Sequence, residues 1–283
     1  MGLGRFAVQP NPAMRQDLGE SDSEPNRGGG QDRRDRGLVK LRVAGTGGHP
    51  SRCEQTELGH PVSLLHLAAM HVLVVRHGIT AWNAAGRWQG WEDVPLSPEG
   101  EAQADRAGTI LRAVGPRFDR VVASDLLRAR QTAERIVAAL GQSAVTSTPY
   151  AIEVVEGLRE RDIGAWSGKL TAEIEAQWPG WLDAWRRGEL DRPPEGEYEP
   201  EFRARISTAL EAIATTGQRT LVVTHGGVIR TLEVHYGTDP APVANVSGRW
   251  FGVANGRVTP GDRVDLASAP SASPFPDRSP VVL

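Results

Sequence analysis

The sequence predicts a three-layer α/β/α fold with a mainly parallel central sheet. Two observations lead to this prediction. Short runs of Val, Ile and Leu alternate with longer stretches in which apolar residues recur every three or four positions, a pattern typical of βαβ units. Two of the longer stretches also begin after Ser and end before Gly, as helices commonly do. Helices that connect neighbouring parallel strands cover both faces of the sheet, which gives a layered architecture.

Four short apolar runs are the expected parallel strands. They are His71–Val75, Phe118–Ala123, Ile152–Val155 and Thr220–Thr224. The β-branched residues of His71–Val75 suit a buried strand. Nearer the C-terminus, Arg249–Val253 and Arg257–Thr259 flank Asn255-Gly256. Because Asn-Gly favours a two-residue hairpin turn, we expect an antiparallel edge there.

The helices are predicted from caps and from apolar spacing. Ser97 is the expected N-cap of a helix over Pro98–Val114, with proline at its first position. Ser124 is the expected cap of a second helix, which ends at Gly141 and has an apolar face. Three further helices are expected, over Thr171–Trp178, over Glu201–Ala214 and from Val228 onward, and the Gly- and Pro-rich stretch Gly188–Pro200 is expected to be a loop or lid.

The two ends of the chain differ in composition from the rest. Residues 1–69 contain 11 Gly, 5 Pro and a single aromatic residue, Phe6. Such a stretch buries too little apolar surface to offset the entropy of ordering it, so we expect a disordered extension. Alternatively, Met70 is the true start, since a strand begins directly after it. The domain then covers residues 70–266, and residues 267–283, rich in Ser and Pro, form a second disordered tail.

Composition excludes several classes of protein. With 32 basic and 35 acidic residues the net charge is −3, which disfavours nucleic-acid binding because no surplus of cations is available. The single cysteine, Cys53, excludes an intrachain disulfide and a zinc site with several thiolates. No apolar run reaches the ~20 residues of a membrane span, and no signal peptide is evident, so the cytoplasm is the expected compartment.

Two expected strands end in almost the same residues. Leu73–Gly78 reads LVVRHG and Leu221–Gly226 reads LVVTHG. Ligands of open parallel sheets bind at the carboxyl ends of the strands, so His77 and His225 are expected to face one ligand. Two imidazoles beside Arg76 suit a phosphoryl group, which needs positive charge and several N–H donors. A single His-Gly would more often be a solvated loop end; the pair is what indicates a site.

Two further residues can contribute N–H donors. Asn83, six residues beyond His77, can supply an amide from the following loop. Arg128 lies in the first turn of the helix after Ser124, where a helix N-terminus favours anions. Taken alone, Arg128 would be a surface charge; together with Arg76 it is expected to form a bidentate clamp.

The chain resembles the histidine phosphatase superfamily, also called phosphoglycerate-mutase-like. The resemblance rests on five blocks that occur in the family's order over roughly residues 70–260: Val75–Thr80 with Asn83, Pro95–Ser97 with Gly100 and Gln103-Ala104, Ser124–Ala129 with Gln131–Ala133, Leu158–Glu160 with Gly164–Gly168, and Thr224–Gly227. It implies a phosphoglycerate-mutase-like version of the predicted fold.

The resemblance also implies covalent phosphoryl transfer without a metal or other cofactor. His77 is then the nucleophile that carries the phosphoryl group as phosphohistidine, and Glu160 is the general acid for the leaving oxygen. His225 also belongs to the catalytic set. The residues expected to hold the phosphoryl oxygens are Arg76, Asn83, Arg128 and His225.

Departures from the family pattern favour hydrolysis of small phosphomonoesters over a mutase reaction. Asp162-Ile163 stand where mutases of the family typically carry His-Tyr, and Glu160 and His225 are only 65 positions apart, whereas the mutases carry a longer insertion that closes over the intermediate. A cofactor-dependent phosphoglycerate mutase is the alternative. A regulatory or binding member without activity is a second alternative, which the complete catalytic set disfavours.

The leaving group of the substrate is only weakly encoded. Arg87 and Arg161 are candidates for binding a substrate carboxylate, and Trp88 is one of several tryptophans that can stack on a sugar or an apolar group. The expected substrate-binding residues are therefore Arg87 and Trp88. The expected partner is a small phosphomonoester, with no nucleic acid and no membrane; the sequence leaves a homodimer open.

Overall fold

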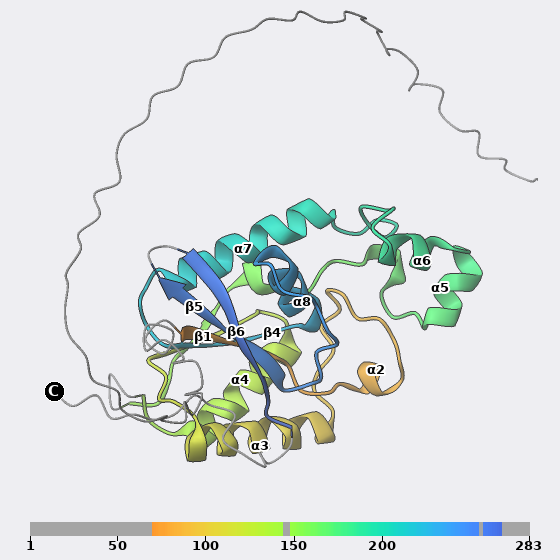
Figure 1. Cartoon of the computed structure of the whole chain (residues 1–283). Coiled ribbons are helices and arrows are strands. Elements are labelled where there is room, and N and C mark those ends of the chain that lie inside the picture. The colour runs from red at the N-terminus through yellow and green to blue at the C-terminus, as the bar shows by residue number, and fades with distance from the viewer. Residues whose placement is uncertain (1–69, 144–147, 255–256, 268–283) are drawn as a thin grey trace, which may run out of the picture. The chain divides into compact units, whose positions relative to one another are not determined.

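The central sheet has six strands in the order β3-β2-β4-β1-β5-β6 (Figure 1). The computed structural model describes residues 70–143, 148–254 and 257–267. The strands are β1 Met70–Arg76, β2 Arg120–Ala123, β3 Ile152–Val154, β4 Thr220–Thr224, β5 Ser247–Ala254 and β6 Arg257–Asp265. Strands β1 to β4 pair in parallel, whereas β5 and β6 are antiparallel. The predicted parallel sheet and its antiparallel edge are confirmed.

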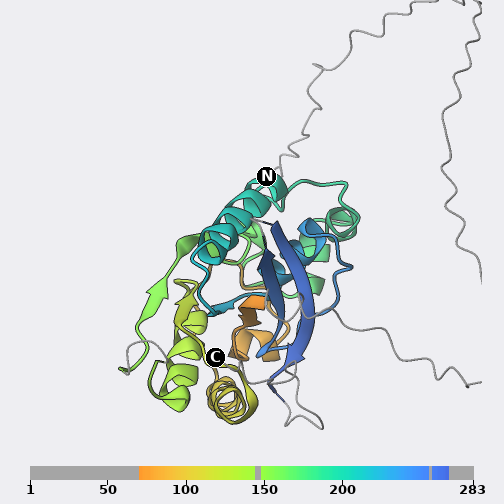
Figure 2. The ribbon, with the colours of Figure 1, turned by 60° about the vertical axis from the view of Figure 1, so that its left-hand side comes forward.

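Helices cover both faces of the sheet. The pair α3 (Pro98–Val114) and α4 (Leu127–Leu140) lies on one face, and α7 (Glu199–Ala214) with α8 (Gly226–His235) lies on the other (Figures 1 and 2). The predicted three-layer α/β/α architecture is therefore confirmed.

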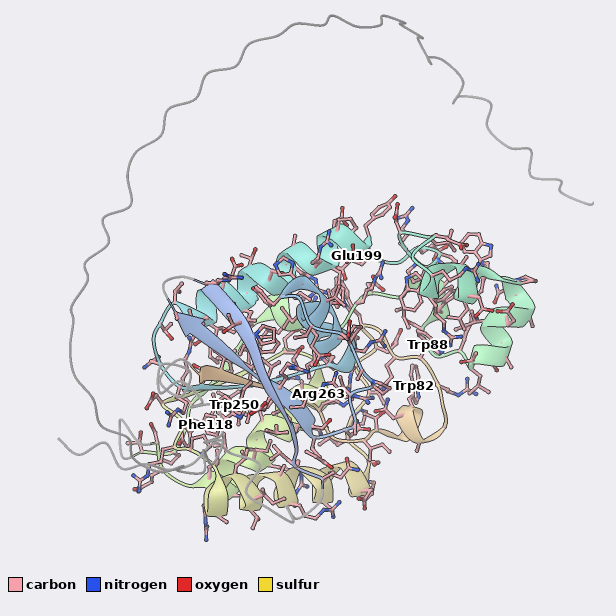
Figure 3. The ribbon with its side chains drawn as sticks, in the orientation of Figure 1. Trp82, Trp88, Phe118, Glu199, Trp250 and Arg263 are labelled. Carbon is pink, nitrogen blue, oxygen red and sulfur yellow. The ribbon has the colours of Figure 1, made fainter. Side chains whose placement is uncertain are left out.

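Each face has its own hydrophobic core because successive strand residues point to opposite sides. On β1, Leu73 and Val75 are buried in the cluster that includes α3 and α4, whereas Val72 and Val74 are buried in the cluster that includes α7 and α8. Phe118 and Trp250 belong to the first cluster and stack with their ring centroids 6.2 Å apart (Figure 3). Because β1 to β4 are parallel, their carboxyl ends lie at the same edge of the sheet, and the two cores hold the strands in this arrangement.

Helix α3 has the predicted bounds, and the Ser97 hydroxyl accepts a hydrogen bond from the Gly100 amide as expected. The predicted cap of α4 is wrong. This helix begins at Leu127 and has no side-chain cap. Ser124 lies one position beyond β2 and its amide still donates to Val223 in the sheet, so its hydroxyl is too early in the chain to cap the helix.

Two other helix starts also differ from the sequence prediction. Helix α7 begins at Glu199 rather than Glu201, because Pro200 is well tolerated in the first turn, and the expected loop is shortened accordingly. Helix α8 begins at Gly226, directly after β4, rather than at Val228. The short helices α2 (Ala81–Ala84) and α6 (Trp181–Arg186) were not expected.

A segment between β3 and α7 extends away from the sheet (Figure 1). It contains α5 (Thr171–Gln177) and α6, together with two 3-10 turns, η1 Glu156–Leu158 and η2 Gly164–Trp166. Fully buried Trp166 contacts Trp88 and Trp185 edge-on, with centroid distances of 5.9 and 5.5 Å. This tryptophan cluster anchors the segment to the loop that follows α2.

Several predictions concern residues outside the described part of the chain. These are the disordered extension over 1–69 with the alternative start at Met70, the turn at Asn255-Gly256 and the tail after residue 267. Among the helices of the described part, none is both long and apolar enough to cross a membrane.

Candidate active site

The parallel pairing of β1 with β4 brings the two strand-end histidines together. Arg76 is in register with Thr224, and the His77 amide donates to the Thr224 carbonyl at 2.9 Å. The rings of His77 and His225 follow directly and have their centroids 5.3 Å apart. The juxtaposition expected from the two similar strand ends is therefore present in the structure.

Hydrogen bonding sets the tautomer of His77. Its Nδ1 lies 2.6 Å from the Gly78 carbonyl oxygen, an acceptor only, so Nδ1 carries the proton. Nε2 therefore keeps its lone pair, and the Arg128 Nε–H points to it at 3.3 Å. Burial, followed by the charges of Arg128 and Arg76, holds the pKa of His77 well below its ordinary value. The ring is thus neutral at neutral pH.

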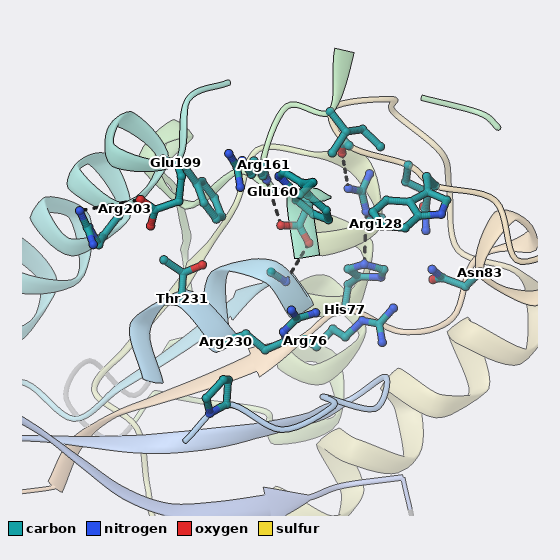
Figure 4. Close-up of a pocket in the computed structure, with 18 of the residues that line it drawn as sticks. Arg76, His77, Asn83, Arg128, Glu160, Arg161, Glu199, Arg203, Arg230 and Thr231 are labelled. Carbon is teal, nitrogen blue, oxygen red and sulfur yellow. Dashed lines mark hydrogen bonds and ion pairs between the residues drawn. The ribbon is translucent and has the colours of Figure 1, made fainter. Parts of the chain in front are cut away.

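Two arginines supply the positive charge near this ring. Arg128 in the first turn of α4 is 1% exposed and donates to the carbonyl oxygens of Glu92 and Gly90 at 2.7 and 2.8 Å. Burial lowers its pKa to about 10, which leaves it charged at neutral pH. Arg76 donates from Nη1 to the Val243 carbonyl at 2.7 Å, and its buried Nε has no partner among the described residues. Both guanidinium groups are held by backbone oxygens and face the same space (Figure 4).

Glu160 lies between η1 and η2 with both carboxylate oxygens held by backbone amides. Gly227 donates to Oε2 at 3.0 Å and Arg161 donates to Oε1 at 2.9 Å (Figure 4). A Cβ atom at Gly227 would overlap Oε1. Only glycine at this position allows the first turn of α8 to approach the carboxylate so closely.

His225 is fully buried and is held by Ser124. Its Nε2 lies 2.8 Å from the Ser124 hydroxyl, and its Nδ1 has no partner among the described residues. Burial, and then the charge of Arg128, lowers the pKa of His225 well below its ordinary value. Sequence reasoning assigned Ser124 to a helix cap and did not anticipate this contact.

Asn83 differs in detail from the prediction. It belongs to α2 rather than to a loop, and its side chain accepts a hydrogen bond from the Thr80 amide at 3.3 Å. At Gly78, the glycine after His77, a Cβ would meet the Gly100 carbonyl oxygen at 2.5 Å, so this glycine permits close packing against α3.

A cavity of about 450 Å³ joins these residues to the exterior of the molecule. Of the predicted site residues it is lined by Arg76, His77, Asn83, Arg87, Trp88, Arg128 and Glu160, but not by His225. Its other walls come from the loop after α2, from Ile163 directly before η2, from Trp185 of α6, and from one face each of α7 and α8. The structure thus brings all but one of the predicted site residues to a single cavity.

Arg87, Arg161 and Trp88 were the candidates for binding the leaving group, but their side chains mainly contact other residues of the protein. Arg87 donates to the Gly168 carbonyl at 2.6 Å and pairs with Glu173. Arg161 donates to backbone carbonyls, including that of Glu197 at 3.2 Å. Trp88 is part of the tryptophan cluster. They line the cavity mainly as supports of its wall.

Sequence reasoning missed a network that holds Arg76 in place. Glu233, fully buried on α8, pairs with Arg249 and Arg263. Arg263 also donates to the carbonyls of Ala241 and Pro242, directly before Val243, whose oxygen accepts from Arg76. Figure 3 marks Arg263 beside the β5–β6 pair. No sequence motif connects a glutamate in a helix to an arginine on an edge strand.

The described residues contain no group of three or more His, Cys, Asp or Glu side chains arranged to hold a metal ion. The site consists of one imidazole whose Nε2 is unprotonated and faces Arg128, two buried guanidinium groups and one carboxylate. This set suits an anion with several oxygens, and a phosphoryl group in particular.

The fold and the site define an α/β protein with an arginine-lined cavity at the carboxyl edge of its parallel strands, beside His77. The chain belongs to the histidine phosphatase superfamily (branch 1), whose family model matches residues 72–255. The recognition made from the sequence is therefore confirmed.

Similar curated proteins are named as mutases. The 2,3-bisphosphoglycerate-dependent phosphoglycerate mutase of Xanthobacter autotrophicus is 35% identical over 167 residues, which is 57% of this chain and 78% of that protein. The protein of the same name from Bartonella quintana is 32% identical over 166 residues, with the same coverage.

Similar solved structures include both a mutase and a phosphatase. Phosphoglycerate mutase from Thermus thermophilus is 33% identical, with a TM-score of 0.52, over 69% of this chain and 99% of that one. A mycobacterial glucosyl-3-phosphoglycerate phosphatase in complex with VO3 is 29% identical, with a TM-score of 0.55, over 65% of this chain and 92% of that one.

Proposed function

We propose that the protein hydrolyses small phosphomonoesters through a phosphohistidine formed on His77. The state of the His77 ring is the observation that carries this proposal. The ring is neutral, its Nδ1 is bonded to a carbonyl oxygen at 2.6 Å, and its Nε2 faces the Arg128 guanidinium group. A neutral imidazole can attack phosphorus without a separate base.

In the first step the Nε2 lone pair of His77 attacks phosphorus. The bond between phosphorus and the leaving oxygen breaks, the electron pair stays on that oxygen, and the carboxyl proton of Glu160 is transferred to it. Arg76 and Arg128 balance the charge that accumulates on the phosphoryl oxygens. The amide of Asn83 is a further donor for these oxygens, and His225 adjoins the His77 ring.

In the second step water attacks the phosphohistidine. The Glu160 carboxylate accepts a proton from that water, the bond between phosphorus and Nε2 breaks, and its electron pair returns to the ring. Exposed residues such as Arg203 and Arg230 line the outer part of the cavity. This solvent access supports water as the acceptor.

A phosphoglycerate mutase is the second candidate, in which a phosphate acceptor replaces water. The names of the curated relatives favour it more than they favour hydrolysis. Both candidates share the phosphohistidine and differ only in the second step. The mutase reading requires that the cavity exclude water while the intermediate exists.

One assay distinguishes the two candidates. Purified protein is given 3-phosphoglycerate with a trace of 2,3-bisphosphoglycerate and followed by phosphorus NMR. Faster release of inorganic phosphate supports hydrolysis, and faster formation of 2-phosphoglycerate supports the mutase.

The shared step is tested with His77→Ala. We expect turnover of p-nitrophenyl phosphate to fall by at least ~10³-fold, because the nucleophile is removed, and the acid-labile phosphate trapped on the wild type to disappear. His235→Ala, at an exposed position of α8, is the matched control and should retain activity. Equal rates for wild type and His77→Ala would refute the mechanism.

A further inference from the structure

The cavity carries more positive charge than one phosphoryl group requires. Two glutamates, Glu160 and Glu199, and six arginines line it. Two of the arginines, Arg76 and Arg128, surround the reacting centre, and Arg87 and Arg161 are bonded to backbone carbonyls of the cavity wall. The remaining two, Arg203 and Arg230, are not needed for phosphoryl transfer.

These two arginines differ in their partners. Arg203 lies 3.8 Å from Glu199, which is at the same wall of the cavity. Arg230 is exposed, and no hydrogen bond or ion pair connects it to another residue of the described chain. It is therefore a cation with free donors at the edge of the catalytic cavity. In the close-up its side chain extends from α8 toward Arg76 (Figure 4).

Arg230 lies on the same face of α8 as Gly227, the residue that holds the general acid Glu160. Four residues of α8 line the cavity: Gly227, Arg230, Thr231 and Val234. Their spacing of three, four and seven places them on one face of the helix. Gly227 donates to the Glu160 carboxylate, so Arg230 and Thr231 lie one helical turn, about 5.4 Å, beyond the residue that holds the acid.

In the proposed mechanism the leaving oxygen receives the Glu160 proton, so we expect the rest of the leaving group to lie in the cavity beyond Glu160, along this face of α8. The cavity volume of about 450 Å³ falls within the ~300–1,000 Å³ of pockets that hold whole small molecules, so there is room for a leaving group of several carbons.

We propose that Arg230, assisted by the hydroxyl of Thr231, binds a second anionic group on the leaving group of the substrate. A guanidinium group binds carboxylate and phosphate oxygens in the same bidentate manner. The substrate class is therefore a phosphomonoester with a carboxylate or a second phosphate a few bonds from the ester oxygen. This inference rests on the proposed function, because it assumes that the first phosphoryl group binds at His77.

The test compares substrates that differ only in this second group. The reference, whose leaving group is uncharged, is glycerol 3-phosphate; 3-phosphoglycerate has a carboxylate in place of the terminal CH2OH, and glycerol 1,3-bisphosphate has a second phosphate on that carbon. In Arg230→Gln we expect the ratio of kcat/KM for an anionic substrate to that for glycerol 3-phosphate to fall by about 10- to 100-fold, the usual cost of losing one charge-assisted contact. The substrate whose ratio falls more identifies the group that is bound.

Arg112→Gln is the matched control, since Arg112 is an exposed arginine of α3 outside the cavity, and its ratio should equal that of the wild type. An unchanged ratio in Arg230→Gln for both anionic substrates would overturn the inference.

Calorimetric binding separates failure of this inference from failure of the proposed function. If the wild type hydrolyses none of the three substrates, the proposed function fails. The affinities of wild type and Arg230→Gln for 3-phosphoglycerate and glycerol 3-phosphate then still decide the role of Arg230. We expect the substitution to weaken binding of 3-phosphoglycerate selectively, and equal weakening of both would contradict the inference.

Discussion

The inner and outer halves of the cavity hold their polar side chains in opposite ways. In the inner half, Arg128 is 1% exposed and bonded to two backbone carbonyls, and His77 is 3% exposed and bonded to a third. In the outer half, Arg230 is exposed and has no partner among the described residues, and Arg203 has a partner only at 3.8 Å.

This difference separates the two tasks of the site. Phosphoryl transfer passes through the same geometry for every substrate, and groups fixed before the reaction need no reorganisation during it. A leaving group varies from substrate to substrate, so free side chains near solvent can adapt to it. The inner half should therefore tolerate small displacements poorly and the outer half well.

The largest effect in this comparison is expected from Gly227→Ala. The new methyl group would overlap the Glu160 Oε1 atom, so the carboxylate must move. Displacement of a catalytic group by about 1 Å can cost ~10²-fold in rate, and we expect kcat for glycerol 3-phosphate to fall by this order. The loss should be smaller for p-nitrophenyl phosphate, whose leaving group needs little protonation.

The control is Gly226→Ala in the same turn, where the nearest atom, Arg76 Cδ, is 3.4 Å away. This is an ordinary van der Waals contact, so its loss of kcat should be much smaller. Equal losses on both substrates for Gly227→Ala would contradict a role in positioning the acid and would indicate a general disturbance of α8.

The same comparison explains which parts of the site could be predicted from the sequence. The near-identical strand ends at Arg76-His77 and Thr224-His225 predict that the histidines meet, because register in a parallel sheet follows from the strands themselves. The contact of Gly227 with Glu160 and the place of Arg230 depend on the direction in which α8 leaves β4. That direction is set by packing against the sheet, which no local pattern encodes.

The missed elements have a similar explanation. Helices α2 and α6 have four and six residues, which is too short to show helical periodicity. Ser124 has the right residue type for a helix cap, yet the tertiary structure uses its hydroxyl to hold His225. Local sequence signals therefore predicted the layers well and the connections between them less well.

A second expected effect is a loss of stability when the buried ion pairs of Glu233, which support the inner half of the cavity, are broken. Glu233→Gln removes a fully buried carboxylate that pairs with Arg249 and Arg263. Two largely covered guanidinium groups lose their counter-charge, and breaking such a buried pair costs about 3 kcal/mol. Urea unfolding should show this loss of unfolding free energy. Because Arg263 also fixes the segment that holds Arg76, kcat should fall as well.

The counterpart in the outer half is Glu199→Gln. Its pair with Arg203 is partly exposed and 3.8 Å long, so we expect a change in unfolding free energy within about 0.5 kcal/mol. Equal costs for the two substitutions would show that the supports of the inner half are no stronger than the surface pair, and the comparison would fail.

The last expected effect is the pH dependence of stability. Burial, with the charge of Arg128, lowers the folded-state pKa of both His77 and His225 well below the ordinary value of 6.5. Below that pH the unfolded chain binds more protons than the folded one, so the free energy of unfolding should decrease as the pH falls from 6.5 toward about 5. About one pH unit or more above 6.5 both histidines are largely neutral in either state and contribute almost no slope.

Urea unfolding at several pH values measures this slope in the wild type and in His225→Asn. The substitution should reduce the slope, because it removes one of the two buried rings that resist protonation. His235→Asn, at an exposed position of α8, is the control for loss of a histidine. A slope that stays the same in His225→Asn would mean that the buried ring does not account for the acid sensitivity of the inner half.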